Sequence, residues 1–263
     1  MTARPDPRSA RRRATLLAAT EPVRTVVSAG ALAASFPLLR AAPRGEPHPV
    51  LVLPGLLASD LSTKTLRGWL GRLGYPVVGW ALGRNRGPTK EVNDELPRLV
   101  ASLAAEHGTP VSIVGWSLGG IFARRLARRS PRHVRQVVSL GSPFGQNGHR
   151  YDGSPVSRAY QRLSPLHAVD GPQTTGGSLA RPLAVPSTAV YSRWDGVVDW
   201  RACRQQPGPI SENVAVRSSH LGMGHDPAVL WVVADRLAQP REGWRPFERP
   251  TRFGLGALFP AED

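Results

Sequence analysis

Residues 111–120 are Val-Ser-Ile-Val-Gly-Trp-Ser-Leu-Gly-Gly, a run that places a G-x-S-x-G pentapeptide directly after a strand-like segment. Apolar residues at helical spacing follow it as far as Leu126. A sharp strand-to-helix turn would push Ser117 outward, and only glycine fits two positions before and after it. The spacing of Gly115 and Gly119 therefore predicts a nucleophile elbow. An ordinary strand-to-helix turn is the alternative.

Strand-like and helix-like segments alternate on both sides of this turn. Six short apolar runs are typical of buried parallel strands, at 49–53, 75–80, 111–114, 134–140, 187–191 and 213–217. Helical patterns occupy 61–73, with Asp60 or Ser62 as its cap, 91–107, the segment after the elbow, and 228–237. This alternation predicts the α/β class, with a doubly wound, mostly parallel sheet whose site lies at the carboxyl ends of the strands.

The length of 263 residues favours one domain, expected at 48–239, with a basic segment at 1–47 and a tail at 240–263. A single cysteine, Cys203, excludes an intrachain disulfide and a cysteine-based zinc site. No metal or organic cofactor is indicated.

The formal net charge of +15 favours nucleic acid or an anionic membrane surface as a partner. No nucleic-acid-binding motif accompanies the charge, so we expect no nucleic-acid partner, while peripheral membrane contact stays open. The arginines after the elbow interleave with apolar residues, which predicts the solvated face of an amphipathic helix. They are Arg124, Arg125, Arg128, Arg129, Arg132 and Arg135.

The first 47 residues begin with a basic stretch, 1–13, that we expect to be disordered. An apolar run follows, but Glu21, Pro22 and Arg24 interrupt it, so neither a signal-peptide core nor an 18-residue membrane span is expected. The pattern favours an amphipathic helix at 23–39 that packs on the domain or lies on a membrane. We expect a cytoplasmic, possibly membrane-associated protein in preference to an exported one.

The G-W-S-L-G-G elbow in this setting resembles that of the α/β-hydrolase superfamily, and within it the bacterial esterases and lipases. The resemblance covers about residues 48–239. It implies the α/β-hydrolase fold, a serine nucleophile, an acid after a later strand, a histidine near the C-terminal end and an oxyanion hole of two backbone amides.

The acid and the base that the resemblance implies each have one rival. Asp195 follows the strand at 187–191 in a loop similar to the family's acid loop, although Asp-Gly is also a common turn and Asp199 competes. His220 lies in an S-H-x-G arrangement similar to the family's histidine loop. His225 competes, but Asp226-Pro227 after it favours a helix start there.

The oxyanion hole is expected from the backbone amides of Leu118, directly after the nucleophile, and Leu56. The loop that carries Leu56 resembles the lipase oxyanion loop, but a proline stands where the family has histidine. Leu57 and Trp116 are expected to add an apolar wall to the substrate pocket.

The region 144–183 breaks the alternation, because it is rich in Gly, Pro, Ser and Thr and contains only one short helical pattern, at 156–163. We expect a lid insertion there. The sequence thus predicts a serine hydrolase, an esterase or lipase, with a small-molecule or lipid ester as substrate. A thioesterase or acyltransferase on the same triad, and a basic nucleic-acid or membrane-surface binding protein, are the alternatives.

Overall fold

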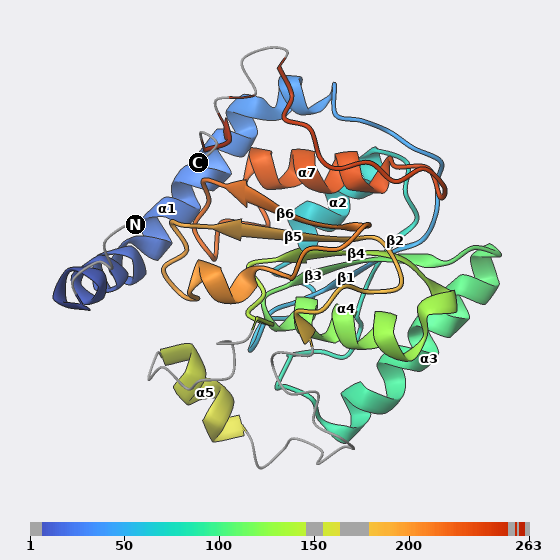
Figure 1. Ribbon diagram of the computed structural model, residues 1–263, viewed down its shortest axis with the longest axis horizontal. Coiled ribbons are helices and arrows are strands. Elements are labelled where there is room, and N and C mark those ends of the chain that lie inside the picture. The colour runs from blue at the N-terminus through green and yellow to red at the C-terminus, as the bar shows by residue number, and fades with distance from the viewer. Residues whose placement is uncertain (1–6, 146–154, 164–178, 252–255, 257, 261–263) are drawn as a thin grey trace.

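Six parallel strands form one sheet in the order β2-β1-β3-β4-β5-β6 (Figure 1). The computed structural model describes residues 7–145, 155–163, 179–251, 256 and 258–260. The strands are β1 (Val50–Leu53), β2 (Val77–Gly79), β3 (Val111–Trp116), β4 (Val134–Leu140), β5 (Ser187–Ser192) and β6 (Ser211–Val216). All six expected strands are present, so the prediction of a doubly wound parallel sheet is confirmed.

Helices cover both faces of the sheet (Figure 1). On one face lie α2 (Lys64–Arg72) and α7 (Pro227–Leu237), with the long α1 (Pro7–Leu39) beside α7. On the other face lie α3 (Lys90–His107) and α4 (Leu118–Arg129). The short helix α5 (Pro155–Leu163) and two single turns, η1 (Pro131–His133) and η3 (Trp200–Cys203), lie in the connections.

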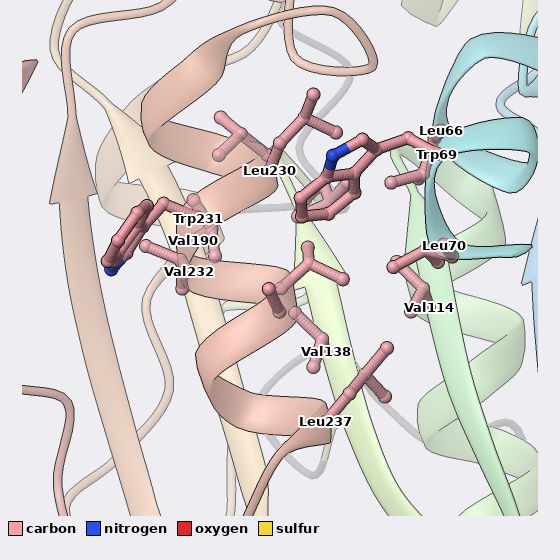
Figure 2. Packing of buried hydrophobic residues seen from close by; sticks show 14 of the residues in the cluster. Leu66, Trp69, Leu70, Val114, Val138, Val190, Leu230, Trp231, Val232 and Leu237 are labelled. Carbon is pink, nitrogen blue, oxygen red and sulfur yellow. The ribbon is translucent and has the colours of Figure 1, made fainter. Parts of the chain in front are cut away.

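The strands are buried on both faces because successive side chains point to opposite sides of the sheet. In β1, Val50 and Val52 belong to the core under α2 and α7, whereas Leu51 and Leu53 belong to the core under α3 and α4. Figure 2 shows the first of these cores, where side chains of α2 and α7 meet over Val114, Val138 and Val190. Two apolar layers therefore fix the sheet between the helices.

The order of the strands reverses at β1, which lies between β2 and β3. In doubly wound sheets the crevice beyond the carboxyl ends of the strands at such a switch point is where ligands bind. Here that position lies between the loop after β1 and the turn after β3, which is the predicted elbow.

The predicted start of α2 was wrong. The helix begins after Thr63, whose side chain makes no capping hydrogen bond. The Asp60 carboxylate instead accepts the backbone N–H groups of Trp80 and Ala81, both at 3.0 Å, and so ties the turn before α2 to the end of β2. A carboxylate that serves a neighbouring strand cannot cap its own helix.

The N-terminal segment is more regular than the sequence indicated, since α1 is helical from Pro7, within the stretch expected to be disordered. The helix predicted at 23–39 is its second half. By length and composition alone, Thr15–Leu39 could cross a membrane, contrary to the expectation from its three interrupting residues; a signal sequence passes the same test. The expected lid at 144–183 lies mostly outside the described residues, although α5 confirms its short helix.

The prediction of one solvated arginine face after the elbow was wrong for Arg124, which is fully buried. Its guanidinium donates to the carbonyl oxygens of Leu179 (2.7 Å) and Arg181 (2.8 Å) and to Gln205 Oε1 (2.7 Å). It also lies over the Phe144 ring. Burial, with Arg128 nearby, lowers the pKa of Arg124 to about 9. The Arg124 guanidinium is therefore held by neutral oxygens, and it contacts both ends of the region 144–183, at Phe144 and at Leu179 and Arg181.

Arg124→Ala should destabilise the fold by about 2–4 kcal/mol, because it removes the three hydrogen bonds of a buried guanidinium and leaves a cavity. Arg129→Ala is the matched control on the same helix, since Arg129 is exposed and its loss should cost less than about 0.5 kcal/mol. Chemical denaturation of both variants measures the difference. Equal stabilities would contradict the anchoring role of Arg124.

Candidate functional site

The turn after β3 holds Ser117 in a backbone conformation that is rare for a residue with a side chain, with φ 53° and ψ −119°. Its N–H donates to the Leu140 carbonyl oxygen at the end of β4 (2.8 Å), which fixes the turn to the sheet. Such strain persists only where surrounding structure imposes it, and it is common at functional sites. Ser117 thus lies at the carboxyl edge of the sheet, as predicted.

Two glycines allow this turn because backbone atoms occupy the space that a Cβ would need. A Cβ on Gly115 would lie 2.4 Å from the Gly119 carbonyl oxygen, and one on Gly119 would lie 2.3 Å from the Leu53 carbonyl oxygen. The steric reason for the spacing is therefore confirmed. Gly120, which the sequence did not mark, is crowded by a side chain instead, because a Cβ there would lie 2.0 Å from Ser142 Oγ.

An aspartate and a histidine from two other loops meet at the same edge. Asp195 Oδ2, after β5, lies 2.6 Å from His220 Nδ1, after β6, and both residues are buried. The other oxygen, Asp195 Oδ1, accepts the N–H groups of Val197 and Val198, both at 2.8 Å. A carboxylate fixed in this way holds the proton on Nδ1 and leaves Nε2 free to accept another.

The pKa of His220 is raised above its ordinary value. Burial alone would lower this pKa, because it disfavours the imidazolium, but the charge and the hydrogen bond of Asp195 outweigh burial, and Glu21 adds to them. The site therefore favours a proton on the imidazole, as a base that must take one from a neighbour requires.

The histidine loop contacts the Trp116 side chain, next to Ser117, and the end of β4. The Trp116 indole N–H donates to the His220 carbonyl oxygen at 3.1 Å, and Trp116 directly precedes Ser117. A Cβ built on Gly141, at the end of β4, would lie 3.1 Å from His220 Nδ1. Among the described residues the Ser117 hydroxyl makes no hydrogen bond, and such contacts often close only when a substrate is bound.

The two rival residues have other partners. Asp199 is half exposed, caps η3 by accepting the Arg201 N–H at 3.0 Å and faces the Arg201 guanidinium. His225 lies before the helix start that the sequence predicts, where Asp226 caps α7. Burial lowers the pKa of His225, and Nδ1 of its ring has no partner in the described part of the chain.

The loop after β1 lies against the elbow, since a Cβ on Gly55 would lie 3.2 Å from the Ser117 Cβ. Buried Asn85, which the sequence analysis missed, holds this loop by donating from Nδ2 to the Pro54 carbonyl oxygen at 2.8 Å. The backbone carbonyl oxygen of Asn85 accepts the Leu57 N–H at 2.7 Å. Among the described residues the Leu56 N–H makes no hydrogen bond. Leu118 is the first residue of α4, where backbone N–H groups have no partner within the helix, so both amides are available to an oxyanion.

Of the two residues predicted to line the pocket, Leu57 is 44% exposed, whereas Trp116 is buried against Gly224 and the histidine loop. Trp116 directly precedes Ser117, and Leu57 belongs to the loop after β1 that contacts Ser117 through Gly55. No sequence signal marked Asn85, because its partners are backbone groups of a loop distant in the sequence.

Comparison with solved structures shows the α/β-hydrolase fold, which confirms the fold that the resemblance in the sequence implies. Lipase B of Aspergillus fumigatus matches with a TM-score of 0.57 and 19% identity over 84% of this chain and 61% of that one. A protein from work on the metagenome-derived lipolytic enzymes LipS and LipT matches with a TM-score of 0.54, 15% identity and coverage of 74% and 93%. The Paleococcus ferrophilus monoacylglycerol lipase matches with a TM-score of 0.51 and 16% identity over 75% of this chain and 97% of that one.

These likenesses establish the fold alone, and this chain spans 61% of the length of the Aspergillus lipase. No protein-family model and no curated protein matches the chain in sequence.

Gly119→Ala should disrupt the elbow, because its Cβ would lie within 3 Å of the Leu53 and Pro54 backbones. We expect a loss of about 2 kcal/mol or more in stability. Gly71→Ala is the control, since a Cβ there meets nothing within 4 Å and alanine favours a helix by about 0.5–1 kcal/mol. Thermal unfolding compares the two variants, and a Gly119→Ala protein as stable as wild type would contradict the crowding.

Proposed function

We propose that the protein is a serine hydrolase that cleaves carboxylic esters with an apolar acyl part, as an esterase or lipase. The observation that carries the proposal is the buried Asp195–His220 pair, 2.6 Å apart, at the same sheet edge as the strained Ser117. A serine hydroxyl is a weak nucleophile until a base removes its proton, and the pair supplies an oriented base.

In the proposed reaction His220 Nε2 takes the proton of Ser117 Oγ as that oxygen attacks the ester carbonyl carbon. Asp195 stabilises the imidazolium that forms, and the amides of Leu56 and Leu118 donate to the carbonyl oxygen as it becomes negative. The alkoxide leaves with the proton from His220. A water molecule, deprotonated by His220, then attacks the acyl carbon, and His220 returns this proton to Ser117 Oγ as the bond to the acyl group breaks and the acid leaves. The acyl-enzyme is thus formed and hydrolysed by the same five groups.

The surroundings of the site support an apolar substrate. Leu57 in the loop after β1, Trp194 in the acid loop and Leu221 in the histidine loop are 44%, 36% and 45% exposed. Each of these exposed apolar residues is next in sequence to a residue of the proposed site, respectively Leu56, Asp195 and His220. A thioester or an acyl acceptor other than water would use the same groups. The lipolytic enzymes that share the fold favour the ester.

Ser117→Ala should abolish ester turnover and labelling by a fluorophosphonate probe while leaving unfolding near wild type. His220→Ala should remove nearly all turnover, about 10⁴-fold or more, because the hydroxyl loses its base. His225→Ala is the matched control and should retain most activity. Turnover of p-nitrophenyl esters of increasing chain length measures this. Activity in the Ser117 variant, or a loss confined to the His225 variant, would overturn the assignment.

Asp195→Asn should lower kcat by about 10⁴-fold with little change in KM, because the lost charge acts on the imidazolium of the transition state. Asp199→Asn has the same change in charge at a half-exposed carboxylate that caps η3, so it should keep kcat within a few fold. Steady-state kinetics of both variants decide. A crippled Asp199 variant beside an active Asp195 variant would contradict the proposal.

A further inference from the structure

The long helix α1 crosses the carboxyl edge of the sheet, near the ends of β5 and β6 (Figure 1). One of its side chains, Glu21, is almost fully buried there, at 3% exposure. It is one of the residues that interrupt the apolar run of this segment. A buried carboxylate needs partners that compensate for its lost hydration, so its contacts show what it does.

The Glu21 carboxylate accepts three backbone N–H groups from the two loops that carry the proposed acid and base. Oε1 accepts the N–H of Gly196 at 2.7 Å and the N–H of His220 at 3.0 Å. Oε2 accepts the N–H of Leu221 at 3.1 Å. One oxygen atom thus joins the residue after Asp195 to His220 itself.

Two glycines let α1 approach these loops. A Cβ on Gly196 would lie 2.4 Å from the Leu17 carbonyl oxygen, and one on Gly222 would lie 2.8 Å from Ser28 Oγ. The contacts reach from Leu17 to Ser28, so α1 lies across both loops.

Arg24, one turn after Glu21, braces the carboxylate. Its guanidinium lies 3.1 Å from Glu21 Oε1 and also donates to the carbonyl oxygens of Leu17 and Trp194. Trp194 directly precedes Asp195, so this second side chain of α1 also holds the acid loop. The two charges of the segment are therefore anchors at the site.

We propose that Glu21 is a positioning residue that sets the distance between the acid loop and the base loop and holds His220 for proton transfer. The inference rests on the proposed serine hydrolase function. Charge-assisted hydrogen bonds to three backbone donors are strong and directional, so they fix the main chain at His220 and beside Asp195. Hydrogen bonds of this kind hold a reacting group in the narrow range of positions that catalysis needs.

The charge of Glu21 also acts on the imidazole. The groups whose charges raise the pKa of His220 are Asp195 and Glu21, while Arg24 faces Glu21. Cys203, which faces Asp195, is a buried thiol whose pKa burial raises well above its ordinary value, so it stays neutral. Removing the Glu21 charge should therefore lower the pKa of His220, which a purely structural contact would not do.

The test uses the full chain with Glu21→Gln, which keeps one acceptor oxygen but removes the charge and turns an amide N–H₂ group toward a backbone donor. We expect kcat for a p-nitrophenyl ester to fall about 10-fold with KM nearly unchanged, and about 100-fold in Glu21→Ala. The acid limb of the rate profile should move to lower pH in Glu21→Gln, because the histidine loses a charge that favours its protonated form.

Glu106→Gln is the matched control, since Glu106 is an exposed residue of α3 and loses the same charge far from the proposed site. A proton NMR titration of His220 measures its pKa without any substrate. If wild type does not turn over esters, the proposed function fails, but the titration still tests the effect of Glu21 on the imidazole. Should Glu21→Ala not fold, Glu21→Gln carries the test. An unshifted His220 titration and wild-type kcat in folded Glu21→Gln would overturn the inference.

Discussion

The close approach between the turn after β3 and the loop after β1 is the constraint on which the proposed site depends. The backbone at Gly119 leaves no space for a Cβ against the carbonyl oxygen of Leu53, so the start of α4 lies directly on the end of β1. This contact is possible because β1 and β3 are neighbours at the point where the strand order reverses. It brings Ser117 and Leu118 to the same edge of the sheet as Leu56, a candidate oxyanion donor from a distant part of the sequence.

The same edge of the sheet concentrates charges that burial makes costly. Asp195, His220 and Glu21 are all buried, and each retains hydrogen bonds that replace water. In such surroundings a fully satisfied network fixes one arrangement, because any broken bond leaves an unpaired polar group. Two carboxylates around one imidazole also favour the imidazolium, which is the species that proton transfer from serine produces. Rigidity and basicity thus come from the same two carboxylates, through their hydrogen bonds and through their charges.

The sequence predicted whatever depends on local pattern. The six strands, the position of Ser117 and the glycine spacing follow from periodicity and from steric limits within ten residues. The proximity of Asp195 and His220 was accessible too, because residues after neighbouring parallel strands meet at one edge. Asn85 was not, since it acts through the carbonyl oxygen of Pro54, and a backbone partner leaves no trace in residue identity. The prediction of the start of α2 was wrong for the same reason, because the Asp60 carboxylate accepts a backbone N–H group at the end of β2.

Arg124 and Glu21 show most clearly what cannot be predicted from the sequence. Charged residues beside apolar ones predict a solvated surface unless an opposite charge lies nearby in the sequence. Arg124 is buried against two carbonyl oxygens and an amide oxygen, while Glu21 is buried mainly against backbone N–H groups. Each of these charges can be buried because several main-chain groups of fixed position compensate for its lost hydration. Main-chain partners of fixed position exist only once the loops are folded. These two charges therefore join distant segments: Arg124 contacts both ends of the region 144–183, and Glu21 joins the loops that carry Asp195 and His220. The N-terminal segment therefore belongs to the architecture of the site, although sequence patterning separates it from the hydrolase-like region.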